Sequence, residues 1–336
     1  MAPNGQRHAS VGTARQPCLK EDPLDTSRLV PREFLGGTRL NHQRHGFPLN
    51  CAATLAGEAD PETIMSETST DLARRFGSIA RLYGADALQR FQHAHVTVIG
   101  IGGVGSWAAE ALARSAIGRI TLVDLDMIAE SNVNRQVHAL DGEFGKAKVS
   151  AMAHRIGAIN PTCEVREIED FVTPETVEAI LGGAVDYVID AIDQVRTKAA
   201  MIAWAKRSAT PLITAGSAGG QIDATRIQIA DLALTIQDPL LSKVRSLLRK
   251  DYGFTREVKK KFGIPAVFSG EPLRHPPRAD ACQQPAPLSG LNCAGFGSSV
   301  CVTAVFGLLA AGEVLKHLAR GEGRAASKGV GAAMPL

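Results

Sequence analysis

A glycine-rich turn is the first feature of this sequence whose residue types could perform chemistry. It contains four glycines, namely Gly100, Gly102, Gly103 and Gly105. The preceding residues 96–99 are a β-branched run that predicts a buried parallel strand, and the Ala- and Leu-rich residues 106–114 predict a helix. Such a turn directs backbone N–H groups and the positive end of a helix at an anion, typically a phosphate. The turn alone does not decide which nucleotide it binds.

Polar residues further along the chain favour a triphosphate over a dinucleotide. Asp124 ends the next apolar run at the spacing from Gly105 that is typical of an acid for a ribose hydroxyl. Asn132, Arg135 and Lys148 then supply an amide, a guanidinium and an ammonium near the expected phosphates. A nicotinamide dehydrogenase leaves its pyrophosphate mainly to backbone amides, whereas several cations suit a triphosphate from which pyrophosphate departs. The sequence therefore indicates an ATP site.

A second acidic residue, Asp193, follows the predicted strand 187–190. It is expected at the carboxyl edge of the sheet, where parallel sheets bind ligands, and could hold Mg²⁺ on the triphosphate. Ordinary structural alternatives exist: Asp190 and Asp193 could cap the following helix. Arg135 and Lys148, taken singly, could be solvated surface residues. The order in which these residues occur together favours the nucleotide site.

Apolar runs alternate with helical patterns along the middle of the chain. The predicted strands are residues 96–99, 120–124, 164–168, 187–190 and 211–214. The predicted helices are a pair within 72–91, then 106–114, 146–159, 172–181 and 197–209. This order predicts an α/β fold with a Rossmann-like, mostly parallel sheet and helices on both faces. Residues 219–229 alternate in polarity and predict a small antiparallel extension, and the apolar residues 294–318 predict a C-terminal helix.

The composition divides the chain into three parts. Residues 1–64 lack a sustained apolar period, so we expect a disordered extension. A helix cap follows Met65, and we expect this methionine to be the natural start of the protein. Residues 65–321 form the expected ATP-binding domain, with a basic segment and a flexible loop at 240–292, and residues 322–336 form a flexible tail.

Length, charge and cysteine usage limit the class of protein. The 336 residues carry a formal net charge of +3, which permits contact with nucleic acid without requiring it. The six cysteines form no Cys-x-x-Cys pair, so we expect no zinc site, no disulfide framework and a cytoplasmic location. Residues 294–318 approach the length of a membrane-spanning helix, but their early glycines favour a buried core helix and make membrane association the lesser alternative.

Long segments of the chain resemble the E1-like, ThiF-type adenylating superfamily and, within it, the family of tRNA threonylcarbamoyladenosine dehydratases. The segments are residues 75–84, 100–114, 134–138, 187–193, 218–223 and 235–239, and the similarity extends from residue 70 to residue 320. That family uses ATP to dehydrate the N6-threonylcarbamoyl group on adenosine 37 of certain tRNAs to a cyclic form. The resemblance implies the same activity here, through an acyl-adenylate from which AMP departs as the ring closes.

The resemblance also assigns roles to the residues named above. It implies that the four glycines of the turn line the phosphates of ATP and that Asp124 holds the ribose. Asn132, Arg135 and Lys148 match phosphate contacts of the superfamily. Asp193 matches the aspartate that holds magnesium and acts in the transition state.

Two kinds of partner are implied by the same resemblance. Members of the superfamily form homodimers in which an arginine of one subunit reaches the triphosphate of the other, and our candidate is Arg75, followed by Arg81. The basic segment is the candidate for contact with the tRNA backbone, although a charge run of this kind can also be an ordinary solvated face. The residues proposed for tRNA contact are Lys243, Arg245, Lys259, Lys260 and Lys261.

One position departs from the family pattern and bears on the alternative functions. Relatives commonly carry a cysteine where this chain has Ala266, so a covalent thiol route through that position is not available. Cys282, Cys293 and Cys301 remain, and free cysteines more often serve packing. The alternatives are adenylation of a ubiquitin-like sulfur carrier, a non-catalytic scaffold with a sulfur-relay partner, and a nicotinamide dehydrogenase. Enzymes that act on sulfur carriers usually hold zinc with paired Cys-x-x-Cys motifs, which this sequence lacks.

Overall fold

The computed structural model describes residues 71–257, 260–274 and 296–321. Several predictions concern parts of the chain outside these residues. They are the disordered extension at 1–64, the start at Met65, the tail at 322–336, and the roles of Lys259, Cys282 and Cys293.

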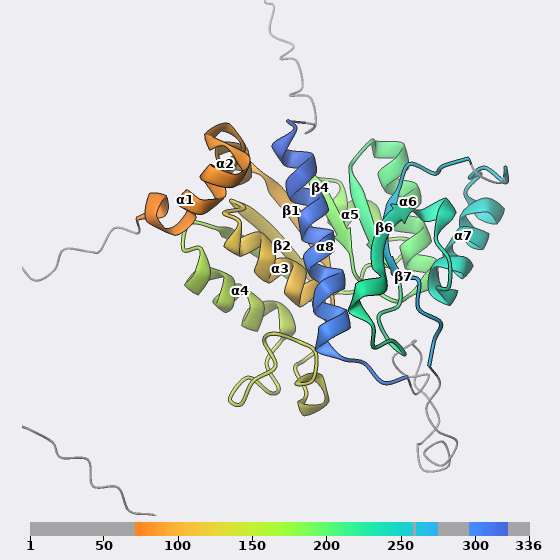
Figure 1. Cartoon of the computed structure of the whole chain (residues 1–336), viewed down its shortest axis with the longest axis horizontal. Helices are drawn as coiled ribbons and strands as arrows, with labels where there is room; N and C mark the ends of the chain where they lie inside the picture. The colour runs from red at the N-terminus through yellow and green to blue at the C-terminus, as the bar shows by residue number, and fades with distance from the viewer. Residues whose placement is uncertain (1–70, 258–259, 275–295, 322–336) are drawn as a thin grey trace, which may run out of the picture. The chain divides into compact units, whose positions relative to one another are not determined.

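The described residues form one sheet of seven strands, in the order β3-β2-β1-β4-β5-β7-β6 (Figure 1). The strands are β1 (His95–Ile99), β2 (Arg119–Val123), β3 (Glu164–Ile168), β4 (Tyr187–Asp190), β5 (Leu212–Ala215), β6 (Ile227–Asp231) and β7 (Pro265–Ser269). All neighbouring strands are parallel except β6 and β7, which are antiparallel. The predicted mostly parallel sheet is confirmed. The antiparallel extension expected at residues 219–229 begins only at Ile227, because residues 224–226 form a 3₁₀ turn, and its partner is β7.

Helices cover both faces of the sheet (Figure 1). The α-helices are α1 (Leu72–Tyr83), α2 (Ala85–His93), α3 (Gly105–Arg114), α4 (Lys148–Ile159), α5 (Val177–Leu181), α6 (Val195–Ser208), α7 (Pro239–Asp251) and α8 (Val300–Ala319). Val98 and Ile189 pack in one core with α3 and α8, whereas their neighbours Ile99 and Val188 pack in a second core with α6 and α7. Because successive side chains of a strand point to opposite faces, a sheet buried on both faces needs continuous apolar runs. These are the runs seen in the sequence.

One predicted helix is shorter in the structure, and two elements, the helix α7 and the strand β7, were not predicted. The helix expected at 172–181 is only α5, because the side chains of Thr173 and Thr176 bond to each other's backbone N–H groups and form a turn before it. The strand β7 was not predicted at all. It lies between β5 and β6, where Ala266 pairs with Thr214 and Ala230, and these pairings join residues far apart in the sequence.

The C-terminal helix α8 is long and apolar enough to cross a membrane by length and composition alone. In the structure it packs along α3, and its residues Val302, Phe306 and Val314 are fully buried. A side chain at Gly307 would lie 2.3 Å from the carbonyl oxygen of Val104, so the two helices cross in close contact there. Packing against α3 and the sheet accounts for the apolar composition, as expected for a core helix.

Candidate active site

A cavity of about 580 Å³ lies at the carboxyl ends of β1, β2, β4 and β5. It sits at the point where the strand order changes direction, between β1 and β4, which is where open α/β sheets bind their ligands. The structure brings eight of the predicted residues to its walls. They are Gly100, Gly102, Gly103, Asp124, Asn132, Arg135, Lys148 and Asp193.

The glycine turn needs its glycines for two different reasons. Gly100 has a φ of +86°, a backbone conformation that other residues rarely adopt. A side chain at Gly105 would lie 1.7 Å from the carbonyl oxygen of Gly100, so only glycine allows α3 to begin against the end of β1. Gly102, in contrast, faces open space in the cavity. The turn is therefore held by its own packing and leaves its backbone accessible to a ligand.

Asp124 and Lys148 form a polar group at the β2 side of the cavity. One carboxylate oxygen of Asp124 accepts the N–H of Ile101 at 2.6 Å, and the other accepts the N–H of Asp126 at 2.9 Å. The ammonium of Lys148, which is buried, lies 2.6 Å from Oδ2 of Asp126 and 3.9 Å from Oδ1 of Asp124. Burial raises the pKa of Asp124, and the positive charge of Lys148 opposes that effect.

Arg135 presents a positive charge with no ion pair among the described residues. Its guanidinium donates to the carbonyl oxygen of Ser131 and to Oδ1 of Asn134, and its alkyl chain packs on Gly103. The indole N–H of Trp107 bonds to the backbone oxygen of Arg135 at 2.9 Å and fixes this part of the loop to α3. Burial lowers the pKa of Arg135. A partly buried guanidinium without an acidic partner is suited to bind an anion.

Asp193 lies across the switch point from the glycine turn, on the loop after β4. Its side chain has no hydrogen bond or ion pair within the described part of the chain. The loop is supported from below by Asp190, whose carboxylate pairs with Lys198 at 2.8 Å and accepts the hydroxyl of Thr214 at 2.6 Å. The backbone N–H of Ile192 also bonds to Asp190. The support holds the loop that carries Asp193 while leaving its carboxylate available.

Several residues that line the cavity were not identified from the sequence. Asp126 pairs with Lys148, and Ser217 follows β5, where its backbone N–H bonds to Asp238 at 2.8 Å. Burial raises the pKa of Asp238. The carboxylate of Asp238 lies so close to Gly216 that a side chain at position 216 would clash with it. Ser217 could have been predicted from the sequence, because it closely follows a predicted strand whose carboxyl end borders the cavity. No local signal marked Thr303, since α8 brings it to the cavity only in the folded chain.

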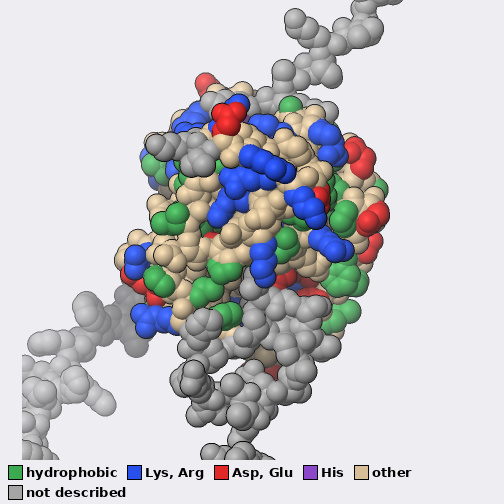
Figure 2. Space-filling view, turned by 90° about the vertical axis from the view of Figure 1, so that its right-hand side faces the viewer, with side chains coloured by type: hydrophobic (Ala, Val, Ile, Leu, Met, Phe, Trp, Pro, Cys, Tyr) green, Lys and Arg blue, Asp and Glu red, His purple; other side chains and the backbone are tan. Residues whose placement is uncertain are grey.

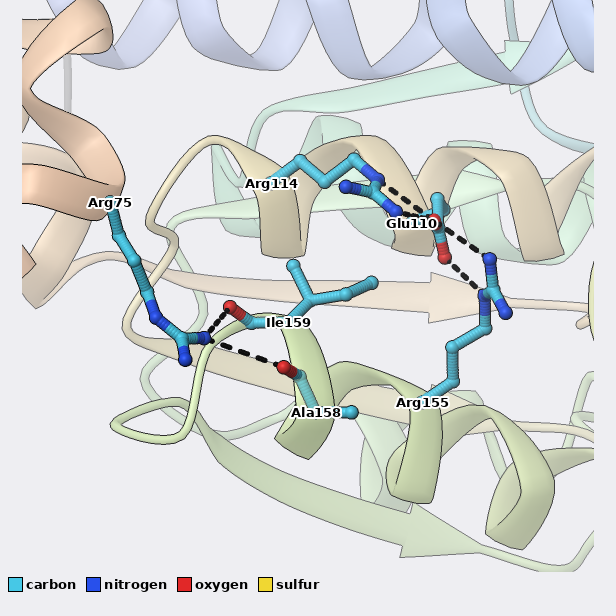
Figure 3. A network of polar contacts seen from close by, with 6 residues as sticks. All are labelled: Arg75, Glu110, Arg114, Arg155, Ala158 and Ile159. Atoms are coloured by element: carbon cyan, nitrogen blue, oxygen red, sulfur yellow. Dashed lines mark hydrogen bonds and ion pairs between the residues drawn. The ribbon is translucent and has the colours of Figure 1, made fainter. Parts of the chain in front are cut away.

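Arg75 does not reach this cavity within its own chain. Its guanidinium donates to the backbone oxygens of Ala158 and Ile159, at the C-terminal end of α4 (Figure 3). Lys148 begins the same helix, whose 12 residues extend over about 18 Å. Figure 3 also shows that α4 is joined to α3 by Glu110, which pairs with both Arg114 and Arg155.

The described residues proposed for tRNA contact, which are Lys243, Arg245, Lys260 and Lys261, do not line the cavity. Lys260 and Lys261 are exposed and precede β7, so they lie at the amino edge of the parallel sheet, opposite the cavity. Lys243 is exposed on α7, whereas Arg245 is partly buried and donates to the hydroxyl of Thr235. Figure 2 shows Lys and Arg side chains gathered on the face that carries α7.

Neither Ala266 nor Cys301 is among the cavity residues. Ala266 is fully buried in β7, within the core formed with α6 and α7. Cys301 is exposed in the first turn of α8. Ala266, where the family resemblance led us to expect a cysteine, is thus a packing position.

The sequence profile of the ThiF family matches residues 76–330. This chain belongs to the ThiF family. It is 53% identical over 246 residues to the tRNA threonylcarbamoyladenosine dehydratase of Haemophilus influenzae. This alignment covers 73% of this chain and 93% of the relative. The Escherichia coli protein of the same name is 51% identical over 260 residues, covering 76% of this chain and 97% of the relative.

The fold has a solved counterpart among ThiF-type enzymes. The Escherichia coli dehydratase TcdA, solved as a crystal structure in complex with ATP, is 49% identical in sequence to this ThiF-family chain. The two structures align with a TM-score of 0.68. The match covers 76% of this chain and 97% of that one. A second crystal structure of TcdA contains AMP. The resemblance expected from the sequence motifs is confirmed.

Proposed function

We propose that this protein uses ATP to dehydrate N6-threonylcarbamoyladenosine at position 37 of tRNA to its cyclic form. The observation that carries the proposal is that Asp124, Arg135, Lys148 and Asp193 line one cavity together with the glycine turn. Two further findings support it. The matches to the two tRNA threonylcarbamoyladenosine dehydratases extend over 93% and 97% of those proteins, and the Escherichia coli enzyme has been crystallised with ATP and with AMP.

The geometry supports one orientation of ATP. The open backbone of Gly102 and the N-terminus of α3 face the phosphates. Asp124 retains lone pairs for a ribose hydroxyl beyond the two backbone bonds it already accepts. Arg135 and Lys148 would neutralise the negative charge that develops as pyrophosphate leaves.

The residues present also fit a magnesium ion carried by the nucleotide. The described residues contain no group of three or more His, Cys, Asp or Glu side chains that could hold a metal alone. Nucleotide-bound Mg²⁺ needs only one or two carboxylates, because phosphate and water oxygens complete its coordination. Asp193, which lines the cavity and has no partner among the described residues, would supply such a ligand. The ion would stabilise charge on the phosphates.

The chemistry then proceeds in two displacements. A carboxylate oxygen of the threonylcarbamoyl group attacks the α-phosphorus of ATP, and pyrophosphate leaves. An internal nitrogen or oxygen of the carbamoyl group attacks the acyl carbon, and AMP leaves with one former carboxylate oxygen. The nucleoside has then lost the elements of water. The second step is intramolecular, so the protein supplies adenylation and positioning without a thiol, consistent with the buried Ala266.

The proposed active form is a cytoplasmic homodimer. Arg75 is exposed and lies at the far end of α4 from Lys148, so in this arrangement it serves the cavity of the partner subunit rather than its own. The exposed residues Lys243, Lys260 and Lys261 are proposed to contact the tRNA backbone. Arg245 is the weakest candidate of this set, since its guanidinium is engaged with Thr235.

The test combines nucleoside mass spectrometry with analysis of the nucleotide products. Purified protein, ATP and Mg²⁺ are incubated with tRNA that carries threonylcarbamoyladenosine and, separately, with a ubiquitin-like sulfur carrier. We expect a nucleoside lighter by one water, formed with AMP and pyrophosphate, in the tRNA reaction only. Asp193→Asn should lose at least 100-fold in rate, while the control Arg196→Ala, at an exposed position of α6 outside the cavity, stays active. Adenylation of the sulfur carrier with unchanged tRNA would refute the proposal.

A further inference from the structure

A second cavity, of about 630 Å³, lies at the opposite edge of the sheet from the candidate active site. The residues at the starts of β4, β5 and β7 line it, namely Tyr187, Leu212 and Pro265. Because these parallel strands begin here, this is the amino edge of the sheet. None of the residues proposed to bind ATP contributes to it.

Three basic side chains from different elements meet at this cavity. Lys206 lies near the end of α6, Lys261 precedes β7, and Arg320 follows α8. All three are exposed, and none forms an ion pair with another described residue. Figure 2 shows the gathering of Lys and Arg side chains on the neighbouring face. The cavity therefore presents positive charge that the described residues do not neutralise.

The two acidic residues at the cavity are already engaged. The carboxylate of Asp231 accepts three backbone N–H groups, from Ala233, Phe262 and Gly263, at 2.9, 2.9 and 2.7 Å. Glu313 pairs with Lys316, 3.7 Å away on the next turn of α8. Neither carboxylate forms an ion pair with the three described cations, so their charged groups remain available to an anionic ligand.

The turn that carries Lys261 is fixed in place by the surrounding structure. Asp231 holds the backbone of Phe262 and Gly263, and the ammonium of Lys206 donates to the carbonyl oxygen of Phe262 at 2.9 Å. Gly263 has a φ of +75°, which makes the turn tight. The rings of Tyr187 and His317, which also line the cavity, pack edge to face with their centroids 5.1 Å apart. Tertiary contacts thus define this wall of the cavity.

We propose that this cavity holds phosphate groups of the tRNA backbone at a distance from the modified nucleotide. The inference rests on the proposed function for the identity of the nucleic acid. Strands of four or five residues separate the two edges of the sheet by about 15 Å. One nucleotide does not extend from the active site to this cavity, whereas a structured polynucleotide does. Ammonium and guanidinium groups without acidic partners are the usual contacts for phosphodiesters.

The test compares two double variants that remove equal charge. Lys261→Ala/Arg320→Ala removes two cations of the cavity and leaves Lys206, whose ammonium also holds Phe262. Arg119→Ala/Arg166→Ala removes two exposed cations from β2 and β3 and serves as the control. We expect the first variant to raise the Kd for tRNA about tenfold and to lower the slope of log K against log salt by about 1.5. Its ATP affinity and its kcat at saturating tRNA should equal those of the wild type.

Each outcome bears on one of the two proposals separately. An unchanged Kd and salt slope in the Lys261→Ala/Arg320→Ala variant, with an active wild-type protein, would overturn the inference and leave the proposed function standing. Tight binding of inorganic phosphate at this cavity without any change in tRNA affinity would also overturn it. A selective loss of tRNA affinity in the cavity variant supports the inference even where the wild type converts no nucleoside, a result that would count against the proposed function alone.

Discussion

The ammonium of Lys198 lies 2.8 Å from Oδ1 of Asp190, and neither side chain is exposed to solvent. Lys198 belongs to α6 and Asp190 ends β4, so this pair ties the helix to the strand directly below the loop of Asp193. Thr214 on the neighbouring strand β5 completes the group with a hydrogen bond to the same carboxylate. The position of the loop therefore depends on an ion pair that lies wholly within the core.

Breaking this pair should be costly. Lys198→Met leaves the carboxylate of Asp190 buried without its counter-charge, and we expect a loss of about 3 to 5 kcal/mol in unfolding free energy. Denaturant unfolding measures it. The double variant Lys198→Met/Asp190→Asn should recover much of the loss, because no buried charge is then left alone. A single variant as stable as the wild type would contradict this view of the pair.

Gly102 provides a test of where the phosphates lie. A side chain there meets no protein atom within 4 Å, so Gly102→Ala should change unfolding free energy by less than about 1 kcal/mol. ATP affinity, measured by calorimetry, should nevertheless fall at least tenfold, because the methyl group occupies the space in which phosphate approaches the backbone. The control is Gly157→Ala on α4, which also meets nothing and lies outside the cavity. Equal ATP affinity in both variants would place the phosphates elsewhere.

Arg75 should act across subunits. Arg75→Ala should abolish turnover, and so should Asp193→Asn, because each removes a charge needed at the same site from a different chain. Mixing and re-forming dimers from the two variants should restore activity, since one site of each mixed dimer then has both residues. Arg74→Ala, at the exposed neighbouring position, should remain active. If the mixture stays inactive while mixed dimers form, Arg75 does not act in trans.

His138 should make stability depend on pH. It is buried with no hydrogen-bond partner on either ring nitrogen among the described residues. Burial lowers its pKa to about 4, and the positive charges of Lys148 and Arg155 act in the same direction against Glu143. The unfolded chain therefore binds more protons than the folded one between about pH 6.5 and 4, and stability falls as pH falls through this range, by roughly 3 kcal/mol.

The replacement His138→Phe isolates this contribution. The variant keeps an aromatic ring in the core but cannot take up a proton, so its unfolding free energy should vary less between pH 6.5 and 4 than that of the wild type. His154→Ala, at an exposed position of α4, should retain the wild-type dependence. An unchanged pH dependence in His138→Phe would show that other groups cause it.

Local sequence pattern was enough to predict the parallel core of the fold and most of the residues that line the candidate ATP site. Short continuous apolar runs mark strands buried on both faces, and glycines occur where a turn needs them, so β1, β4 and the turn at Gly100 follow from local pattern. Asp124 and Asp193 follow from the same pattern, because the carboxyl ends of parallel strands meet at one edge. The amide and cations of Asn132, Arg135 and Lys148 then favoured a triphosphate over a dinucleotide, and the family resemblance agreed.

The remaining features could not be predicted from the sequence, because they depend on contacts between residues distant in the chain. The place of β7 depends on its pairing with β5 and β6, and the arrival of Thr303 at the cavity depends on how α8 packs across α3. The structure also placed Arg75 at the far end of α4 and Lys261 at the opposite edge of the sheet. Residue type showed that these side chains are charged, but the direction of each strand and helix set where that charge lies.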